Sequence, residues 1–214
     1  MKERIIFFNG WGMDQNVINH FCSGDYEIFS FDSYHHDETV KKISQLDNNH
    51  VNHLIAFSLG VYMASFLLEN SNLNFKTSTA INGTLKPYDE NYGISPDIFD
   101  KTIENWSIAG KNSFNKRMIK FDHLLGKYLS IQPSRSLEDQ KSELIYIRNL
   151  IKNHPAPRNI FSLALVGDQD RIFPAMNQIE FWDSCSRHKI IESPHFPFFS
   201  FKNFTQLMEF IKNC

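Results

Sequence analysis

A serine surrounded by small residues is the first place where this sequence could do covalent chemistry. Ser58 lies in Ala56-Phe57-Ser58-Leu59-Gly60, after an apolar run and before a helical stretch. At such a strand-to-helix turn a serine adopts a strained conformation that exposes its hydroxyl, and small neighbours leave room for the turn. The same pattern also fits an ordinary serine at a helix start. It predicts Ser58 as a nucleophile if a base and an acid follow it.

His195 is the histidine best placed to take a proton from Ser58. The chain contains nine histidines, and most of the others have polar neighbours typical of surface positions. His195 lies between the last short apolar run and the final helical stretch, where a loop can bring an imidazole to the serine. In sites built on a strand-to-helix serine, the chain order is serine, acid, histidine. We therefore predict His195 as the general base.

Two aspartates compete for the role of the acid that orients this histidine. Asp168 and Asp170 both follow the apolar run 160–166 and precede the histidine, as the chain order requires. Each could equally be a turn or helix-cap residue. Glu138 or Asp139 is a third, more distant alternative.

The reaction also needs hydrogen-bond donors for the negative charge that develops on the attacked oxygen. In this type of site the donors are two backbone N–H groups: that of the residue after the serine, here Leu59, and one from the loop after the first strand. That loop reads Asn9-Gly10-Trp11-Gly12, and its glycines allow a sharp turn that exposes the Trp11 amide. We predict Trp11 and Leu59 as the oxyanion donors, with the Trp11 indole as a wall of the substrate pocket.

Residues so far apart in the chain can meet only if the fold brings several loops to one edge of a sheet. Short β-prone runs alternate with helical stretches, which predicts an α/β fold: a mainly parallel sheet of about six strands with helices on both faces. The predicted strands cover residues 4–8, 26–32, 52–57, 76–82, 160–166 and 188–192, and the predicted helices cover 15–22, 38–46, 60–70, 175–185 and 200–213.

Residues 86–158 interrupt this alternation. The segment begins with loop signals, continues as helical stretches near 96–106, 111–121 and 138–152, and ends in a Pro-Ala-Pro sequence. We predict a helical lid inserted into a core formed by residues 1–85 and 159–214.

The predicted lid also carries most of the positive charge. Between Lys111 and Arg158 there are ten basic and four acidic residues, whereas the formal charge of the whole chain is −2. Such a segment can attract an acidic partner, although solvated helix faces have the same composition. Aromatic residues are sparsely interleaved there, which argues against nucleic acid.

The composition limits the classes of protein to consider. With 42% hydrophobic and 21% charged residues, the chain is typical of a soluble globular protein, and no apolar run approaches the ~20 residues that cross a bilayer. The first apolar segment is too short for a secretory signal, so we expect a cytoplasmic location. Cys22, Cys185 and Cys214 lack the spacing of a disulfide framework or a zinc site. We expect no membrane span, metal or organic cofactor.

Together these residues resemble a carboxylesterase of the α/β-hydrolase superfamily, and more closely the BioG-type pimeloyl-acyl carrier protein methyl ester esterases. The acid region matches the superfamily pattern Gly-x-x-Asp-x-Ile-x-Pro, which selects Asp170 over Asp168. The segments that carry the closer resemblance are Phe8-Asn9-Gly10-Trp11-Gly12, Ala56-Phe57-Ser58-Leu59-Gly60-Val61, Thr79-Ala80-Ile81-Asn82-Gly83-Thr84 with Tyr92-Gly93-Ile94, and Arg171-Ile172-Phe173-Pro174-Ala175-Met176-Asn177-Gln178.

The resemblance implies a serine esterase of biotin biosynthesis. Its substrate would be the methyl ester of a pimeloyl chain on acyl carrier protein (ACP), with Ser58 as nucleophile, His195 as base and Asp170 as orienting acid. ACPs are acidic, so the basic lid would face the carrier. The candidate carrier-binding residues are Lys116, Arg117, Lys120, Arg135, Arg148 and Lys152.

Two other functions fit the same residues. A general short-chain carboxylesterase would share the triad and the fold without preferring a carrier-bound substrate. A catalytically silent interaction protein on a hydrolase scaffold would be expected to lack a triad member, and the sequence has a candidate for each. We also expect a monomer.

Overall fold

A six-stranded parallel sheet forms the centre of the molecule. The computed structural model describes residues 3–21 and 23–214, the side chains of residues 36–38 apart. The strand order is β2-β1-β3-β4-β5-β6, and every neighbouring pair is parallel. The strands are β1 (Glu3–Phe8), β2 (Glu27–Phe31), β3 (Val51–Phe57), β4 (Phe75–Ile81), β5 (Leu163–Gly167) and β6 (Arg187–Ile191). The predicted α/β-hydrolase fold with about six strands is confirmed.

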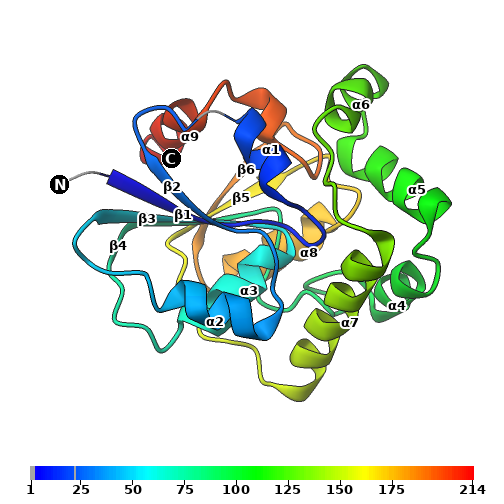
Figure 1. The fold of residues 1–214 in the computed structure, drawn as a ribbon, viewed down its shortest axis with the longest axis horizontal. Coiled ribbons are helices and arrows are strands. Elements are labelled where there is room, and N and C mark those ends of the chain that lie inside the picture. Colours follow the sequence, from blue (N-terminus) through cyan, green and yellow to red (C-terminus); the bar gives the residue numbers. More distant parts are fainter. Residues whose placement is uncertain (1–2, 22) are drawn as a thin grey trace.

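Helices cover both faces of this sheet (Figure 1). Helices α1 and α9 lie on one face, and α2, α3 and α8 lie on the other. Their bounds are α1 (Gln15–His20), α2 (His36–Ile43), α3 (Leu59–Leu68), α8 (Ala175–Asp183) and α9 (Phe204–Lys212), with a short 3-10 turn at Phe198–Ser200. The predicted end of the first helix at residue 22 lies outside the described residues.

Four further helices separate β4 from β5 and gather beside the carboxyl ends of the strands (Figure 1). They are α4 (Pro96–Glu104), α5 (Ile108–Ile119), α6 (Asp122–Leu129) and α7 (Leu137–Asn153), which we call the helical segment. The sequence analysis did not predict α6. Lys120, with a φ of 63°, ends α5, and the chain begins a second short helix two residues later.

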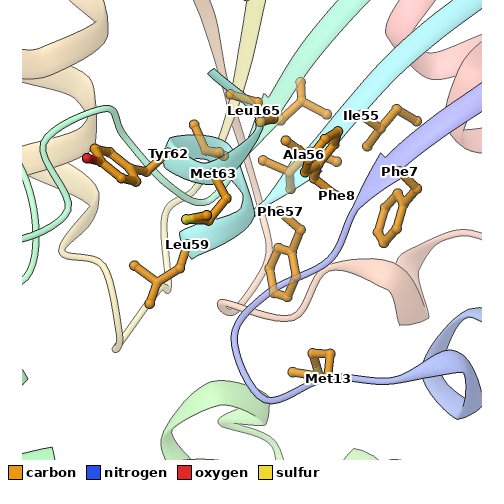
Figure 2. Packing of buried hydrophobic residues seen from close by; sticks show 14 of the residues in the cluster. Phe7, Phe8, Met13, Ile55, Ala56, Phe57, Leu59, Tyr62, Met63 and Leu165 are labelled. Atoms are coloured by element: carbon orange, nitrogen blue, oxygen red, sulfur yellow. The ribbon is translucent and has the colours of Figure 1, made fainter. Parts of the chain in front are cut away.

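Two central strands are buried on both faces, which explains their continuous apolar sequence. Residues Ile5 to Phe8 of β1 and Leu54 to Phe57 of β3 are each at most 2% exposed. In their parallel pairing Phe8 lies opposite Ala56, and Figure 2 shows the two residues packed together. These strands form a rigid base, and the loops that carry the chemistry begin at their carboxyl ends.

Candidate active site

Ser58 occupies the turn between β3 and α3 in a conformation that few residues tolerate. Its φ is 57° and its ψ is −129°, a strained backbone geometry for a residue with a side chain. A Cβ on Gly60 would overlap the carbonyl oxygens of Phe8 and Asn9, and one on Gly83 would overlap the carbonyl oxygen of Ser58. The glycines therefore allow the close packing that the turn requires.

The structure brings Ser58, His195 and Asp170 together in one hydrogen-bonded chain. His195 Nε2 lies 3.0 Å from Ser58 Oγ, and His195 Nδ1 lies 2.7 Å from Asp170 Oδ2. All three side chains are buried, and His195 is 1% exposed. The ring of Phe173 stacks on the imidazole, with centroids 6.1 Å apart and an angle of 8° between the planes. This arrangement can move a proton from the serine to the imidazole while the carboxylate holds the ring.

Asp170, not Asp168, is the aspartate that contacts the histidine. Asp170 Oδ1 accepts hydrogen bonds from the backbone N–H groups of Ile172 at 2.8 Å and Phe173 at 2.9 Å, and Oδ2 accepts one from Gln178 Nε2 at 3.1 Å. Asp168 is exposed and accepts a 3.2 Å hydrogen bond from a backbone N–H of the histidine loop. Asp170 therefore lies in the buried site and Asp168 lies at the surface, although only one residue separates them in the sequence.

The more distant acid candidates lie on α7 and contact other residues. Glu138 is exposed. Asp139 accepts a 2.6 Å hydrogen bond from Arg135 Nε and lies 2.9 Å from His35 Nε2. Glu138 therefore faces solvent and Asp139 pairs with Arg135 and His35, so neither carboxylate orients His195.

Asn82, at the end of β4, joins the two loops that carry the acid and the base. Its Nδ2 donates to the carbonyl oxygens of Pro194 at 3.1 Å and His195 at 2.8 Å, and its Oδ1 accepts from the Gly167 N–H at 2.6 Å. Its φ of 49° is the left-handed conformation that asparagine tolerates better than most residues. In the sequence, Asn82 is notable only as part of the segment that carries the family resemblance, and no local signal predicts this role.

The predicted oxyanion donors lie at the same pocket as the serine. Gly10, Trp11 and Leu59 line it together with Ser58. Neither the Trp11 nor the Leu59 backbone N–H donates a hydrogen bond to another residue in the described part of the chain. The Trp11 indole N–H donates to the Gln140 carbonyl oxygen at 2.6 Å, so the ring is fixed at one side of the pocket.

The pocket above Ser58 is mainly apolar and open to solvent, and it contains about 530 Å³ of space free of protein atoms when the solvent at its mouth is included. Its walls come from the core and from the helical segment. They include Met13, Phe57, Ile98, Phe99, Phe114, Met118, Leu144 and Ile172. A site of this kind accepts a hydrocarbon chain and leaves few polar contacts to orient it.

The six candidate carrier-binding residues have different surroundings. Lys116 and Lys152 are exposed. Arg117 lines the pocket, and its buried Nε has no hydrogen-bond partner in the described residues. Lys120 donates to Gln169 Oε1 at 2.6 Å, and Arg148 pairs with Asp100 at 3.1 Å.

Arg135 has to be removed from that set. Its side chain is 10% exposed and pairs with Asp139 at 2.6 Å and with the buried Glu143 at 2.8 Å. A guanidinium held between two carboxylates inside the protein has no free face for a partner. The sequence showed its charge but not its burial.

No cluster of three or more potential metal-ligating His, Cys, Asp or Glu side chains occurs in residues 3–21 and 23–214. Within the same residues, the helices are too short or too polar to span a bilayer.

The chain matches one family model and is similar to several solved structures. The family model described as pimeloyl-ACP methyl esterase BioG matches residues 2–207. The crystal structure of BioG from Haemophilus influenzae has a TM-score of 0.81 and 25% sequence identity, covering 95% of this chain and 94% of that one. An esterase from Exiguobacterium antarcticum, at 16% identity, has a TM-score of 0.71 over 98% of this chain and 92% of its own.

A longer relative is known from Bacteroides fragilis. It is 33% identical over 199 residues, 91% of this chain, and is named malonyl-[acyl-carrier protein] O-methyltransferase. The match spans only 40% of that protein's length. That name therefore belongs to a protein more than twice as long as the matched region.

Proposed function

The chain belongs to the pimeloyl-ACP methyl esterase family BioG, and from that premise we propose that it hydrolyses the methyl ester of a pimeloyl chain carried on ACP, in biotin biosynthesis. The observation that carries the proposal is the hydrogen-bonded chain from Ser58 through His195 to Asp170 beneath an apolar pocket. A cytoplasmic, monomeric enzyme remains our prediction from the sequence.

The proposed mechanism has two halves that use the same groups. Ser58 Oγ attacks the ester carbonyl carbon while His195 Nε2 takes the serine proton, and Asp170 stabilises the resulting imidazolium. The backbone N–H groups of Trp11 and Leu59 hold the oxyanion. The tetrahedral intermediate collapses when His195 returns the proton to the methoxy oxygen, and methanol leaves. Water, deprotonated by His195, then cleaves the acyl-enzyme to the free carboxylate and regenerates Ser58.

The pocket supports an acyl chain as the bound part of the substrate. A pimeloyl methyl ester presents methylene groups between its ester and its thioester, and these match an apolar wall. Ester carbonyl and serine meet at the bottom of the pocket in this proposal, and the thioester end runs out past the helical segment, which acts as a lid. Lys116, Arg117, Lys120 and Lys152 remain the proposed contacts for the acidic carrier, with Arg148 partly neutralised by Asp100.

The decisive experiment incubates the protein with pimeloyl-ACP methyl ester and follows the free carboxylate by mass spectrometry. We expect Ser58→Ala to lower the rate by about 10³-fold or more, since the nucleophile is lost. Ser65→Ala is a matched control, because Ser65 is also buried near the site on α3 but its hydroxyl has no hydrogen-bond partner among the described residues. Conversion that continues unchanged in Ser58→Ala would contradict the mechanism.

A further inference from the structure

A buried carboxylate on α7 takes no part in the proposed chemistry, yet it contacts the loop that carries an oxyanion donor. Glu143 is fully buried, with 0% exposure. Its Oε2 accepts from the Gly12 N–H at 2.9 Å and from Arg135 Nη1 at 2.8 Å, and its Oε1 accepts from the Tyr34 N–H at 2.8 Å. Among the described residues, the hydrogen-bond partners of this carboxyl group are all donors, which is the environment that an ionised carboxylate needs.

Gln140, one turn earlier on α7, contacts the same loop. Its side-chain Nε2 donates to the Gly12 carbonyl oxygen at 2.8 Å, and its backbone carbonyl accepts the Trp11 indole N–H at 2.6 Å. Glu143 and Gln140 thus bind both polar backbone groups of Gly12, and Gln140 also holds the neighbouring ring. Gly12 has a φ of 71°, so this fixed conformation is one that favours glycine.

Arg135 completes the attachment and balances the charge. Its Nη1 also lies 3.1 Å from the Asp32 carbonyl oxygen and 3.3 Å from the Met13 carbonyl oxygen. One guanidinium therefore joins the buried carboxylate, the end of the loop and the residue after β2. Replacing one member of such a buried ion pair by a neutral residue leaves the charge of the other member uncompensated.

The loop held in this way is packed against the serine. A Cβ placed on Gly10 would lie 3.3 Å from the Cβ of Ser58 and 3.1 Å from the Phe57 ring. The Trp11 amide lies between Gly10, which packs against the serine turn, and Gly12, which is bound to α7. A small rotation of the loop would turn that amide away from the oxyanion.

We propose that Glu143 is a positioning residue: together with Gln140 it uses α7 to hold the Trp11 amide in the oxyanion hole. The inference rests on the proposed function for the identity of the reaction. It makes α7 a fixed part of the site. Because the oxyanion forms only in the transition state, a displaced amide lowers kcat and leaves ground-state binding nearly unchanged.

The test compares Glu143→Gln with Glu138→Gln, an exposed carboxylate on the same helix. Glutamine has nearly the same shape as glutamate, but its NH₂ group would face one of the N–H donors that bind Glu143. With p-nitrophenyl butyrate, we expect Glu143→Gln to lower kcat about 10- to 100-fold with KM within about 3-fold, a fraction of the loss measured when an oxyanion donor is removed. Glu138→Gln should stay within 2-fold of wild type.

A transition-state analogue separates positioning from general loss of structure. An alkyl trifluoromethyl ketone accepts Ser58 Oγ at its carbonyl carbon, the serine proton passes to His195, and the oxygen becomes an oxyanion. Its inhibition constant should rise by the same factor as kcat/KM falls, while the KM for the ester stays constant. Fluorine NMR of the adduct gives this affinity even where turnover is slow.

Equal kcat and equal ketone affinity in Glu143→Gln and Glu138→Gln would overturn the inference, as would a change in KM alone. If Glu143→Gln does not fold, Gln140→Ala removes the second contact with Gly12 and should shift kcat and ketone affinity in the same direction. The proposed function fails separately, when the wild type hydrolyses the small ester but leaves pimeloyl-ACP methyl ester intact. A wild type that neither turns over an ester nor forms the adduct would overturn both.

Discussion

Both carboxylate oxygens of Asp170 accept hydrogen bonds from groups other than the imidazole. Two backbone N–H groups bind Oδ1, and Gln178 shares Oδ2 with His195. With the carboxylate so held, His195 must present Nδ1–H to the acid and Nε2 to Ser58. Asp168 has no comparable support: in the described part of the chain, its side chain accepts a hydrogen bond from the Ser193 backbone N–H.

Asp170→Asn should therefore be far more damaging than Asp168→Asn. Asparagine at 170 presents an amide where the imidazole needs an acceptor, and we expect kcat to fall about 10³- to 10⁴-fold. Asp168→Asn should stay within a few-fold of wild type. The measurement is kcat for steady-state hydrolysis of a small ester by both variants. A larger loss of kcat in Asp168→Asn than in Asp170→Asn would identify Asp168 as the orienting acid.

Asn82→Asp tests whether the amide at the end of β4 keeps the acid and base loops together. Aspartate still accepts from Gly167, but it sets a carboxylate oxygen against the Pro194 and His195 carbonyl oxygens. We expect a loss of about 2–4 kcal/mol in the free energy of unfolding, together with a lower kcat. The His195 carbonyl oxygen loses this donor, the Pro194 carbonyl oxygen keeps the Ser193 hydroxyl as a donor, and a buried carboxylate faces both oxygens. Urea unfolding and ester hydrolysis measure the two effects, with the exposed Asn112→Asp as control. Wild-type stability in Asn82→Asp would show that the bridge is dispensable.

The side-chain contacts of the helical segment decide which of its charges remain available to a partner. Helix α7 is fixed by Glu143, Gln140 and Arg135, whereas its Arg148 pairs with Asp100 of α4. The Tyr88 hydroxyl and then Arg148 lower the pKa of Asp100. The exposed Lys116 and Lys152 lie on α5 and α7. The charge of Lys152 also helps to lower the pKa of Asp100, and its Nζ lies 5.7 Å from the centroid of the Tyr88 ring.

Charge reversal at Lys116 and Lys152 should separate a carrier-dependent esterase from a general one. The double variant Lys116→Glu/Lys152→Glu is expected to lower kcat/KM for pimeloyl-ACP methyl ester about 10-fold at low salt, since surface charges mainly steer association. Hydrolysis of a small ester should not change. Lys189→Glu, an exposed lysine on the edge strand β6, is the control. Equal losses on both substrates, or none on either, would favour the general carboxylesterase.

At the scale of the whole molecule, a histidine in the centre of the sheet couples stability to pH. His53 is 0% exposed on β3, with Nδ1 2.8 Å from Thr77 Oγ1 and Nε2 3.7 Å from Glu3 Oε2. Burial lowers the pKa of His53 below 6.5, aided by Lys212 and Lys76, while Glu3 opposes the shift. As pH falls below 6.5 the unfolded chain takes up the proton first, so the free energy of unfolding decreases.

We expect the free energy of unfolding to fall between pH 6.5 and the lower folded-state pKa, with a slope no steeper than about 1.4 kcal/mol per pH unit, the limit for one proton. Unfolding in urea at pH 7.5, 6.5 and 5.5 measures it. His53→Gln, which cannot titrate, should show a shallower decline than wild type, and the exposed His123→Gln should retain the wild-type slope. Parallel curves for wild type and His53→Gln would exclude a contribution from this group.

The sequence by itself determined the fold class and the chain order of the site. Alternating strands and helices are encoded in local hydrophobic patterns, and a serine between small residues is recognisable because the turn excludes larger neighbours. Strand positions were accordingly predicted within a few residues at each end.

The resemblance already favoured Asp170 over Asp168, but only the tertiary structure brings the Asp170 carboxylate to the histidine, and only it decided which basic residues face solvent. The conformation of the turn after β5 decides which of Asp168 and Asp170 points toward the histidine, and composition does not encode that conformation. In the sequence, Arg135 cannot be distinguished from a surface arginine. Its burial is evident only in the structure, where it pairs with the buried Glu143. Gly12 and Glu143 are 131 residues apart in the chain, and Asn82 and His195 are 113 apart. Contacts over such distances depend on how complete elements pack, and no local pattern in the sequence carries that information.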